Sequence, residues 1–163
     1  MMRTLLAPAL GLTTLLMAAA AFAAPSAIVV RGAWIRATPD GATTAAGYLS
    51  AANSAKSDDR LMGGTSPAAR ELAPHHMSMA GGVMLMSRAT GGLPVPAGGV
   101  LTLAPSGDHL MLIGLTRPLK TGDHVRAVLT FANAGKVAVD FQVRATAPAP
   151  PPKTGGMAGM DMR

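Results

Sequence analysis

The sequence predicts an all-β fold, either a β-sandwich or a Greek-key barrel. Short runs rich in Val, Ile, Leu and Thr alternate between apolar and polar residues, as the strands of a half-buried sheet do. Turn-forming residues separate these runs roughly every eight to twelve residues, which is typical of sandwiches and barrels. The 19 Gly and 13 Pro of the 163-residue chain also favour many turns, and no stretch of the domain predicts a convincing helix.

Three short strands are expected in the first part of the domain. Residues 27–36 are β-branched and alternating, and Gly32 within them indicates a bulge. A Pro-Asp-Gly turn within residues 37–44 separates this strand from the next. The second and third strands are expected at 45–52 and 60–63.

The later strands follow the same pattern of short apolar runs and turns. The Pro-rich segment 93–99 is expected to be a connection. The turn at Asn133 to Gly135 predicts a β-hairpin between the last two strands. The strands of this part are expected at 83–86, 100–103, 109–115, 125–131 and 136–145.

The two ends of the chain differ from the domain between them. Residues 1–24 have an early Arg3, an apolar run and an Ala-Phe-Ala site, which together predict a cleavable secretory signal peptide rather than a membrane anchor. Residues 25–145 form the predicted domain, and residues 146–163 are a Pro-rich linker followed by a Met-rich tail that is expected to be disordered. We therefore expect an exported, periplasmic protein without a stable membrane span.

The charge and the cysteine content of the chain argue against two classes of function. Without Arg3, the chain has 13 Lys and Arg against 8 Asp and Glu, a formal net charge of +5. The cations are scattered and aromatic residues are few, which argues against nucleic-acid binding. The absence of Cys excludes a blue-copper electron-transfer site, because such a site needs a thiolate ligand.

The stretch from His75 to Met111 has the residues most able to bind a metal. It contains three of the four His of the chain together with five Met. Side chains two apart on a strand share a face, so His109 and Met111 can point to one place. Imidazole and thioether ligands favour Cu(I). We predict a Cu(I) site made of His75, Met86, His109 and Met111, with His76 and Met77 as further candidates; the simpler alternative is that these Met fill the core.

Several motifs resemble the periplasmic copper chaperone family called PCu(A)C. They are G-A-W-I-R-A-T-P-D-G, H-H-M-S-M with G-V-M-L-M, and P-A-G-G-V-L-T-L with G-D-H-L-M-L-I-G-L, and the resemblance spans residues 28–143. It implies a cupredoxin-like β-sandwich that binds one Cu(I) through two His and two Met. The family's first His falls on His75, with ten residues between it and Met86, and its H-x-M pair falls on His109 and Met111.

The resemblance also implies partners. The family passes copper toward the CuA centre of cytochrome c oxidase, often alongside Sco-type proteins. Pro74 departs from the expected strand residue, and the doubled His makes His76 a rival for His75. The tail could be an auxiliary copper-binding arm or an inert segment, and its candidate ligands are Met157, Met160 and Met162.

We therefore expect a monomeric metal-binding chaperone rather than an enzyme, with Cu(I) as its cargo and Cu(II) binding left open. A hydrolytic or copper-dependent enzyme would need Asp108 with His109, or Asp123 with His124, to converge, and neighbours on a strand point to opposite faces. Two alternatives remain: an exported β-sandwich interaction module, and a copper-storage or resistance protein without a dedicated oxidase target.

Overall fold

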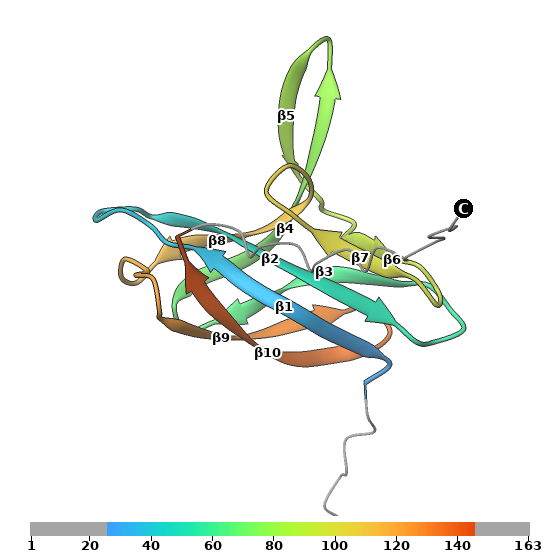
Figure 1. Ribbon diagram of the computed structural model, residues 1–163. Coiled ribbons are helices and arrows are strands. Elements are labelled where there is room, and N and C mark those ends of the chain that lie inside the picture. The colour runs from blue at the N-terminus through green and yellow to red at the C-terminus, as the bar shows by residue number, and fades with distance from the viewer. Residues whose placement is uncertain (1–25, 146–163) are drawn as a thin grey trace, which may run out of the picture.

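A computed structural model describes residues 26–145, and these residues form ten β-strands (Figure 1). No helix that could cross a membrane occurs within this described part. The predicted signal peptide and the Met-rich tail lie outside it. The strands are β1 Ile28–Arg36, β2 Thr44–Asn53, β3 Asp59–Ser66, β4 Ala69–Ala80, β5 Val83–Arg88, β6 Leu93–Val95, β7 Val100–Leu103, β8 His109–Leu115, β9 His124–Phe131 and β10 Gly135–Arg144.

Seven of the strands close into a barrel with a cupredoxin-like fold, which confirms the predicted fold class. Around the ring the order is β4-β8-β2-β1-β10-β9-β3, and β3 pairs with β4 to close it. Most neighbours are antiparallel, but β1 and β10 are parallel. The remaining strands β5, β6 and β7 extend from this ring, pairing with β4, β3 and β2 respectively.

Two predicted local features are present. The pairing of β1 with β2 shifts register between Arg31 and Trp34, and Gly32 has a φ of 60°, so the bulge lies where the glycine indicated it. The turn before Gly135 joins β9 and β10 into the expected antiparallel hairpin, in which Gly135 pairs with Phe131.

The prediction for residues 93–99 was wrong at its start, where Leu93–Val95 form strand β6. Pro94 is tolerated there because β6 lies at the end of the strand order and pairs only with β3 among its neighbours in the sheet.

Strand β4 is longer than the sequence indicated, and it runs through Pro74. The carbonyl of Pro74 accepts a hydrogen bond from the Ala89 amide, so the Pro74 nitrogen also faces away from β8. On that side β4 changes its partner from β3 at Leu72 to β5 at His75. The missing N–H therefore falls in a gap between two ladders and costs no hydrogen bond with β8.

The barrel interior is filled by aliphatic side chains and two Phe. Along β8, Leu110 and Leu112 are buried in this core, at 0% and 1% exposed, while Met111 between them points to the outside of the barrel. The largest fully buried side chains are Phe131, Phe141, Ile35, Leu61, Leu110, Leu112, Leu119, Leu129, Val95 and Val143. Strand β8 thus presents His109 and Met111 on the face opposite its core residues.

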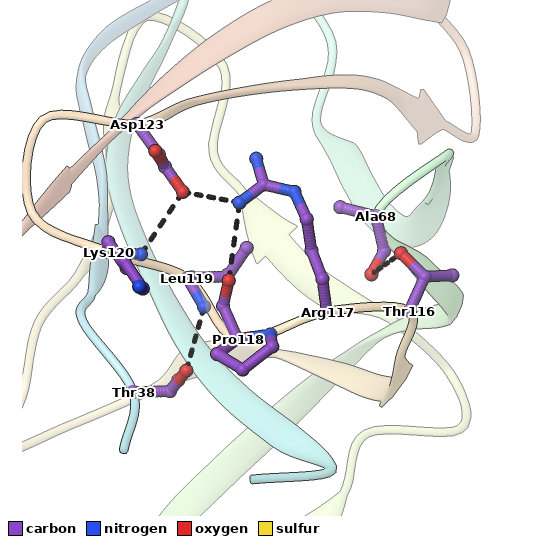
Figure 2. A network of polar contacts seen from close by, with 8 residues as sticks. All are labelled: Thr38, Ala68, Thr116, Arg117, Pro118, Leu119, Lys120 and Asp123. Carbon is purple, nitrogen blue, oxygen red and sulfur yellow. Dashed lines mark hydrogen bonds and ion pairs between the residues drawn. The ribbon is translucent and has the colours of Figure 1, made fainter. Parts of the chain in front are cut away.

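A polar network fixes the connection between β8 and β9 (Figure 2). The Asp123 carboxylate lies 2.5 Å from the Arg117 guanidinium and accepts the Lys120 amide at 3.1 Å. The hydrogen bond from Arg117 is the main cause that lowers the pKa of Asp123. The Leu119 amide donates to the Thr38 hydroxyl at 2.9 Å, which ties this loop to the end of β1.

Candidate metal centre

Two histidines face each other on neighbouring strands. His75 of β4 and His109 of β8 are direct partners in the antiparallel register. Their ring centroids are 6.0 Å apart and the rings are stacked, with an interplanar angle of 19°. Both imidazoles therefore lie on the outer face of the barrel, although they are 34 residues apart in the sequence.

Backbone carbonyl groups determine which nitrogen of each ring is free. The Nδ1 atom of His75 is 3.2 Å from the Ala73 carbonyl oxygen, and the Nδ1 atom of His109 is 3.0 Å from that of Gly107. A carbonyl oxygen only accepts, so Nδ1 is the donor in both rings. The Nε2 atom of each neutral imidazole therefore keeps a free lone pair, and a metal would bind at this atom.

Thioethers lie beside this pair on the same face. Met111 follows His109 by two residues, is half-buried, and is in register with the small Ala73 of β4. Met86 of β5 is in register with Met77 of β4, and Met86 is 54% exposed. Because partners across an antiparallel pair share a face, all of these side chains are on the His75 side of the sheet.

The register places His75 between the two predicted methionine ligands. Ala73 pairs with Met111 and Met77 pairs with Met86, so each methionine is a diagonal neighbour of His75. Diagonal neighbours in a sheet have Cα atoms about 7–8 Å apart, within reach of a long side chain. Met77 lies two residues after His75 along β4, on the same face, and is less exposed than its partner Met86.

His76 points to the other face of β4. Its Nδ1 atom is 2.7 Å from Oδ1 of Asp108, and the same oxygen accepts the Met77 amide at 3.2 Å. Asp108, which immediately precedes His109, thereby connects the start of β8 to β4. The structure does not bring His76 to the side of the sheet where His75 and His109 stack.

The other candidate groups are elsewhere. His124 of β9 pairs with Asp140 of β10 at 3.0 Å, and Asp123 pairs with Arg117, so these two neighbours do not converge. The tail residues Met157, Met160 and Met162 lie outside the described residues.

Sequence reasoning missed the aromatic wall behind His109. The rings of Tyr48 and His109 have centroids 6.4 Å apart, and Trp34 packs on Tyr48 at 4.5 Å. Trp34 and Tyr48 are both 5% exposed, and burial raises the pKa of Tyr48. The sequence has no local signal for this contact, because it depends on the register of β1 with β2, where Trp34 and Tyr48 are partners.

An ion pair lies on the other side of His75. Arg88 of β5 is the register partner of His75, and its guanidinium pairs with the Glu71 carboxylate of β4. Both side chains are exposed, so this pair stabilises the fold little. The ion pair of Arg88 and Glu71 therefore lies at the edge of the face that carries the imidazoles and thioethers, and its two charges balance each other.

Comparison with known proteins gives concordant matches. Residues 28–143 match the family described as "Putative lipoprotein LpqE-like". A relative from Leifsonia xyli subsp. xyli, named a "Putative lipoprotein", is 34% identical over 117 residues, which are 72% of this chain and 69% of that protein.

Solved structures share the fold. The copper-bound PCuAC domain from PmoF2 is 30% identical, with a TM-score of 0.64, over 76% of this chain and 97% of that one. The Cu(I) form of DR1885 from Deinococcus radiodurans is 34% identical, with a TM-score of 0.55, over 78% of this chain and 83% of that one.

Proposed function

Because the chain belongs to the LpqE-like, PCuAC-type family, we propose that it is an exported copper chaperone. It binds one Cu(I) on the outer face of the barrel through His75, Met86, His109 and Met111. It delivers this ion to the CuA-containing subunit of cytochrome c oxidase, with a Sco-type protein as a further partner. The similarity to copper-bound and Cu(I)-bound domains supports copper as the cargo.

The stacked pair of His75 and His109 is the observation that carries this proposal. Both rings have Nδ1 at a backbone carbonyl, and both leave Nε2 available on a face that also has thioethers. A pair of histidines in a purely structural role would need hydrogen-bond partners for these nitrogens or would face water. Here the hydrogen bond at Nδ1 leaves Nε2, one of the two imidazole nitrogens that can bind a metal, free in both rings.

The ligand chemistry favours Cu(I) over other ions. Imidazole and thioether are neutral and soft to borderline, so they suit a monovalent soft cation. Ca²⁺ and Mg²⁺ prefer oxygen ligands, and protein Zn²⁺ sites usually include thiolate or carboxylate groups or several imidazoles. Cu(II) is the oxidation state that this set of ligands would hold less well.

Exposure supports transfer of the ion rather than its permanent retention. His109 is only 7% exposed, whereas Met86 is 54% exposed on a hairpin that stands away from the barrel (Figure 1). A partner's ligands can therefore approach copper from the methionine side while His109 keeps its place. Ligand exchange of this kind needs no unfolding of the barrel.

A competition experiment tests the site. We expect His109→Ala to weaken Cu(I) binding by more than about 100-fold in titrations against a chromophoric Cu(I) chelator, because it removes a ligand outright. His124→Ala is the matched control, since His124 is a histidine on another part of the barrel. Equal affinities in the two variants, or tighter binding of Zn²⁺ than of Cu(I) by the unmodified chain, would contradict the proposal.

A transfer assay separates delivery from storage. Copper-loaded protein is mixed with an apo CuA domain, with and without a Sco-type protein, and the copper bound to each protein is measured after the proteins are separated. Delivery predicts that copper moves to the domain, whereas a storage or resistance protein would keep its copper under these conditions.

A further inference from the structure

We propose that Met79 and Met84 form a second Cu(I)-binding position at the tip of the β4–β5 hairpin, outside the site of His75 and His109. This inference rests on the proposed function and extends it. It adds a weaker copper position next to the exposed Met86 side of the site proposed at His75, Met86, His109 and Met111, which we call the inner site.

The register of the hairpin builds the position. Met77 pairs with Met86, and one step further out Met79 pairs with Met84. Side chains of direct partners have Cβ atoms about 4.5–5.5 Å apart, and successive pairs on one face are about 6.6–6.8 Å apart along the strand. Four thioethers thus form two cross-strand pairs that lead outward from His75 on a single face.

The turn at the tip holds this register. Gly81 and Gly82 have φ values of 58° and 80°, and they are the two residues between the paired Ala80 and Val83. A two-residue turn with both φ values positive matches the twist of a β-hairpin and strongly favours glycine. A slip by one residue would move the methionines of one strand to the opposite face.

Burial shows that these methionines do not fill a core. Met79 is 70% exposed and Met84 is 51% exposed, while Leu110 on the inner face of β8 is fully buried. Every residue of β5 is exposed. The usual structural reason for methionine, packing into an irregular interior, is therefore absent at the tip.

The chemistry of the tip suits a weakly held Cu(I). Two thioethers are soft ligands without charge, and the neighbouring Ser78, Ala80, Gly81 and Gly82 add no charged group that would attract Mg²⁺ or Ca²⁺. The pair lacks the imidazoles of the inner site, so it should bind Cu(I) less tightly. A third thioether is available from the adjacent pair of Met77 and Met86.

The test follows each methionine directly. Cu(I) is added stepwise, without oxygen, to residues 25–163 labelled with ¹³C at the methionine methyl groups, and NMR spectra are recorded after each addition. We expect the first equivalent to shift Met86 and Met111 and a later one to shift Met79 and Met84. The double variant Met79→Leu with Met84→Leu should lose one equivalent of bound copper while keeping the tight one.

Controls distinguish the possible outcomes. Met62→Leu, at an exposed methionine of β3, should leave the copper count unchanged. His109→Ala should abolish the tight equivalent but preserve the shifts of Met79 and Met84, so the inner site can fail without this inference failing. Unchanged methyl shifts at Met79 and Met84 would overturn the inference. So would a double variant that keeps all of its copper, because leucine has no thioether to bind it.

Discussion

At the scale of single residues, backbone carbonyl oxygens accept hydrogen bonds from Nδ1 of His75 and His109 and so leave Nε2 of each ring free for a metal. Ala73 and Gly107 are each two positions before the histidine whose Nδ1 contacts their carbonyl. The contact is local, so it forms as soon as each strand takes its conformation. The sequence predicted that His109 and Met111 share a face, but it did not show which ring nitrogen would be free, because any residue can supply the carbonyl.

A second residue-scale feature is the carboxylate of Asp59, which is 4% exposed. It accepts the amides of Arg60 at 2.7 Å, Asn133 at 2.9 Å and Ala134 at 2.8 Å. Burial alone would raise the pKa of Asp59, but these backbone donors outweigh it and lower the pKa. The charged carboxylate thus joins the start of β3 to the turn between β9 and β10.

We predict that Asp59→Asn costs about 2 kcal/mol of folding free energy at pH 7, because one amide loses its acceptor. The pKa of Asp59 is lower in the folded than in the unfolded chain, so its contribution is complete above the unfolded value of about 4 and is lost as pH falls through the folded value. Urea unfolding at pH 7 and at pH 3 should show a smaller difference between the two proteins at pH 3.

Asp40→Asn is the control for this prediction, because Asp40 is an exposed residue in a turn. It should change stability by less than about 0.5 kcal/mol at either pH. A cost of Asp59→Asn that stays constant from pH 7 to pH 3 would show that the charge of this carboxylate is not what stabilises the turn.

At the scale of elements, the β4–β5 hairpin combines a barrel strand with a projecting arm. The inner half of β4 pairs with β8 and β3, whereas its outer half pairs only with β5 among the described strands. The sequence predicted the strand at residues 83–86 but not the length of β4, because Pro74 is usually a sign that a strand ends. The pairing of His75 with His109 depends on that long strand.

We predict that Gly82→Val reduces Cu(I) affinity while leaving the barrel almost as stable as before. Valine is strained at a φ of 80°, so the turn and the register of Met86 with Met77 should loosen. The exposed β5 contributes little to the core, so the urea midpoint should change only slightly. Chelator competition and urea unfolding measure the two effects separately.

Gly98→Val is a matched control for this substitution. Gly98 also has a positive φ, 65°, and a Cβ added there would meet open space, but it lies in the turn between β6 and β7. It should cost similar strain without changing copper affinity. Equal losses of affinity in the two variants would mean that the hairpin register does not determine binding.

At the scale of the whole molecule, the closed barrel places the residues that stabilise the fold and the proposed copper ligands on opposite faces of the sheet. The core faces inward, while the imidazoles and thioethers face outward from β4, β5 and β8. The all-β class could be read from strand periodicity and turns. The closing contact between β3 and β4, and the aromatic wall of Trp34 and Tyr48, could not, because they depend on pairings between strands rather than on any local pattern.

We predict that Leu110→Ala costs about 2–5 kcal/mol of stability but leaves Cu(I) affinity of the folded protein nearly unchanged. Leu110 lies between the two proposed ligands of β8, yet its side chain is fully buried on the inner face. Urea unfolding measures the cost, and chelator competition below the unfolding transition measures affinity. Leu85→Ala, at a leucine that is 49% exposed, should cost far less.

The parallel pairing of β1 with β10 affects how the molecule can be fastened to a surface. Since both strands run the same way, the described chain enters the barrel beside Ile28 and leaves it beside Arg144, at opposite ends. Figure 1 shows the start of β1 on the side away from the hairpin. A bead or bilayer holding the chain ahead of Ile28 would leave the methionine arm pointing outward into solution, free to meet a recipient.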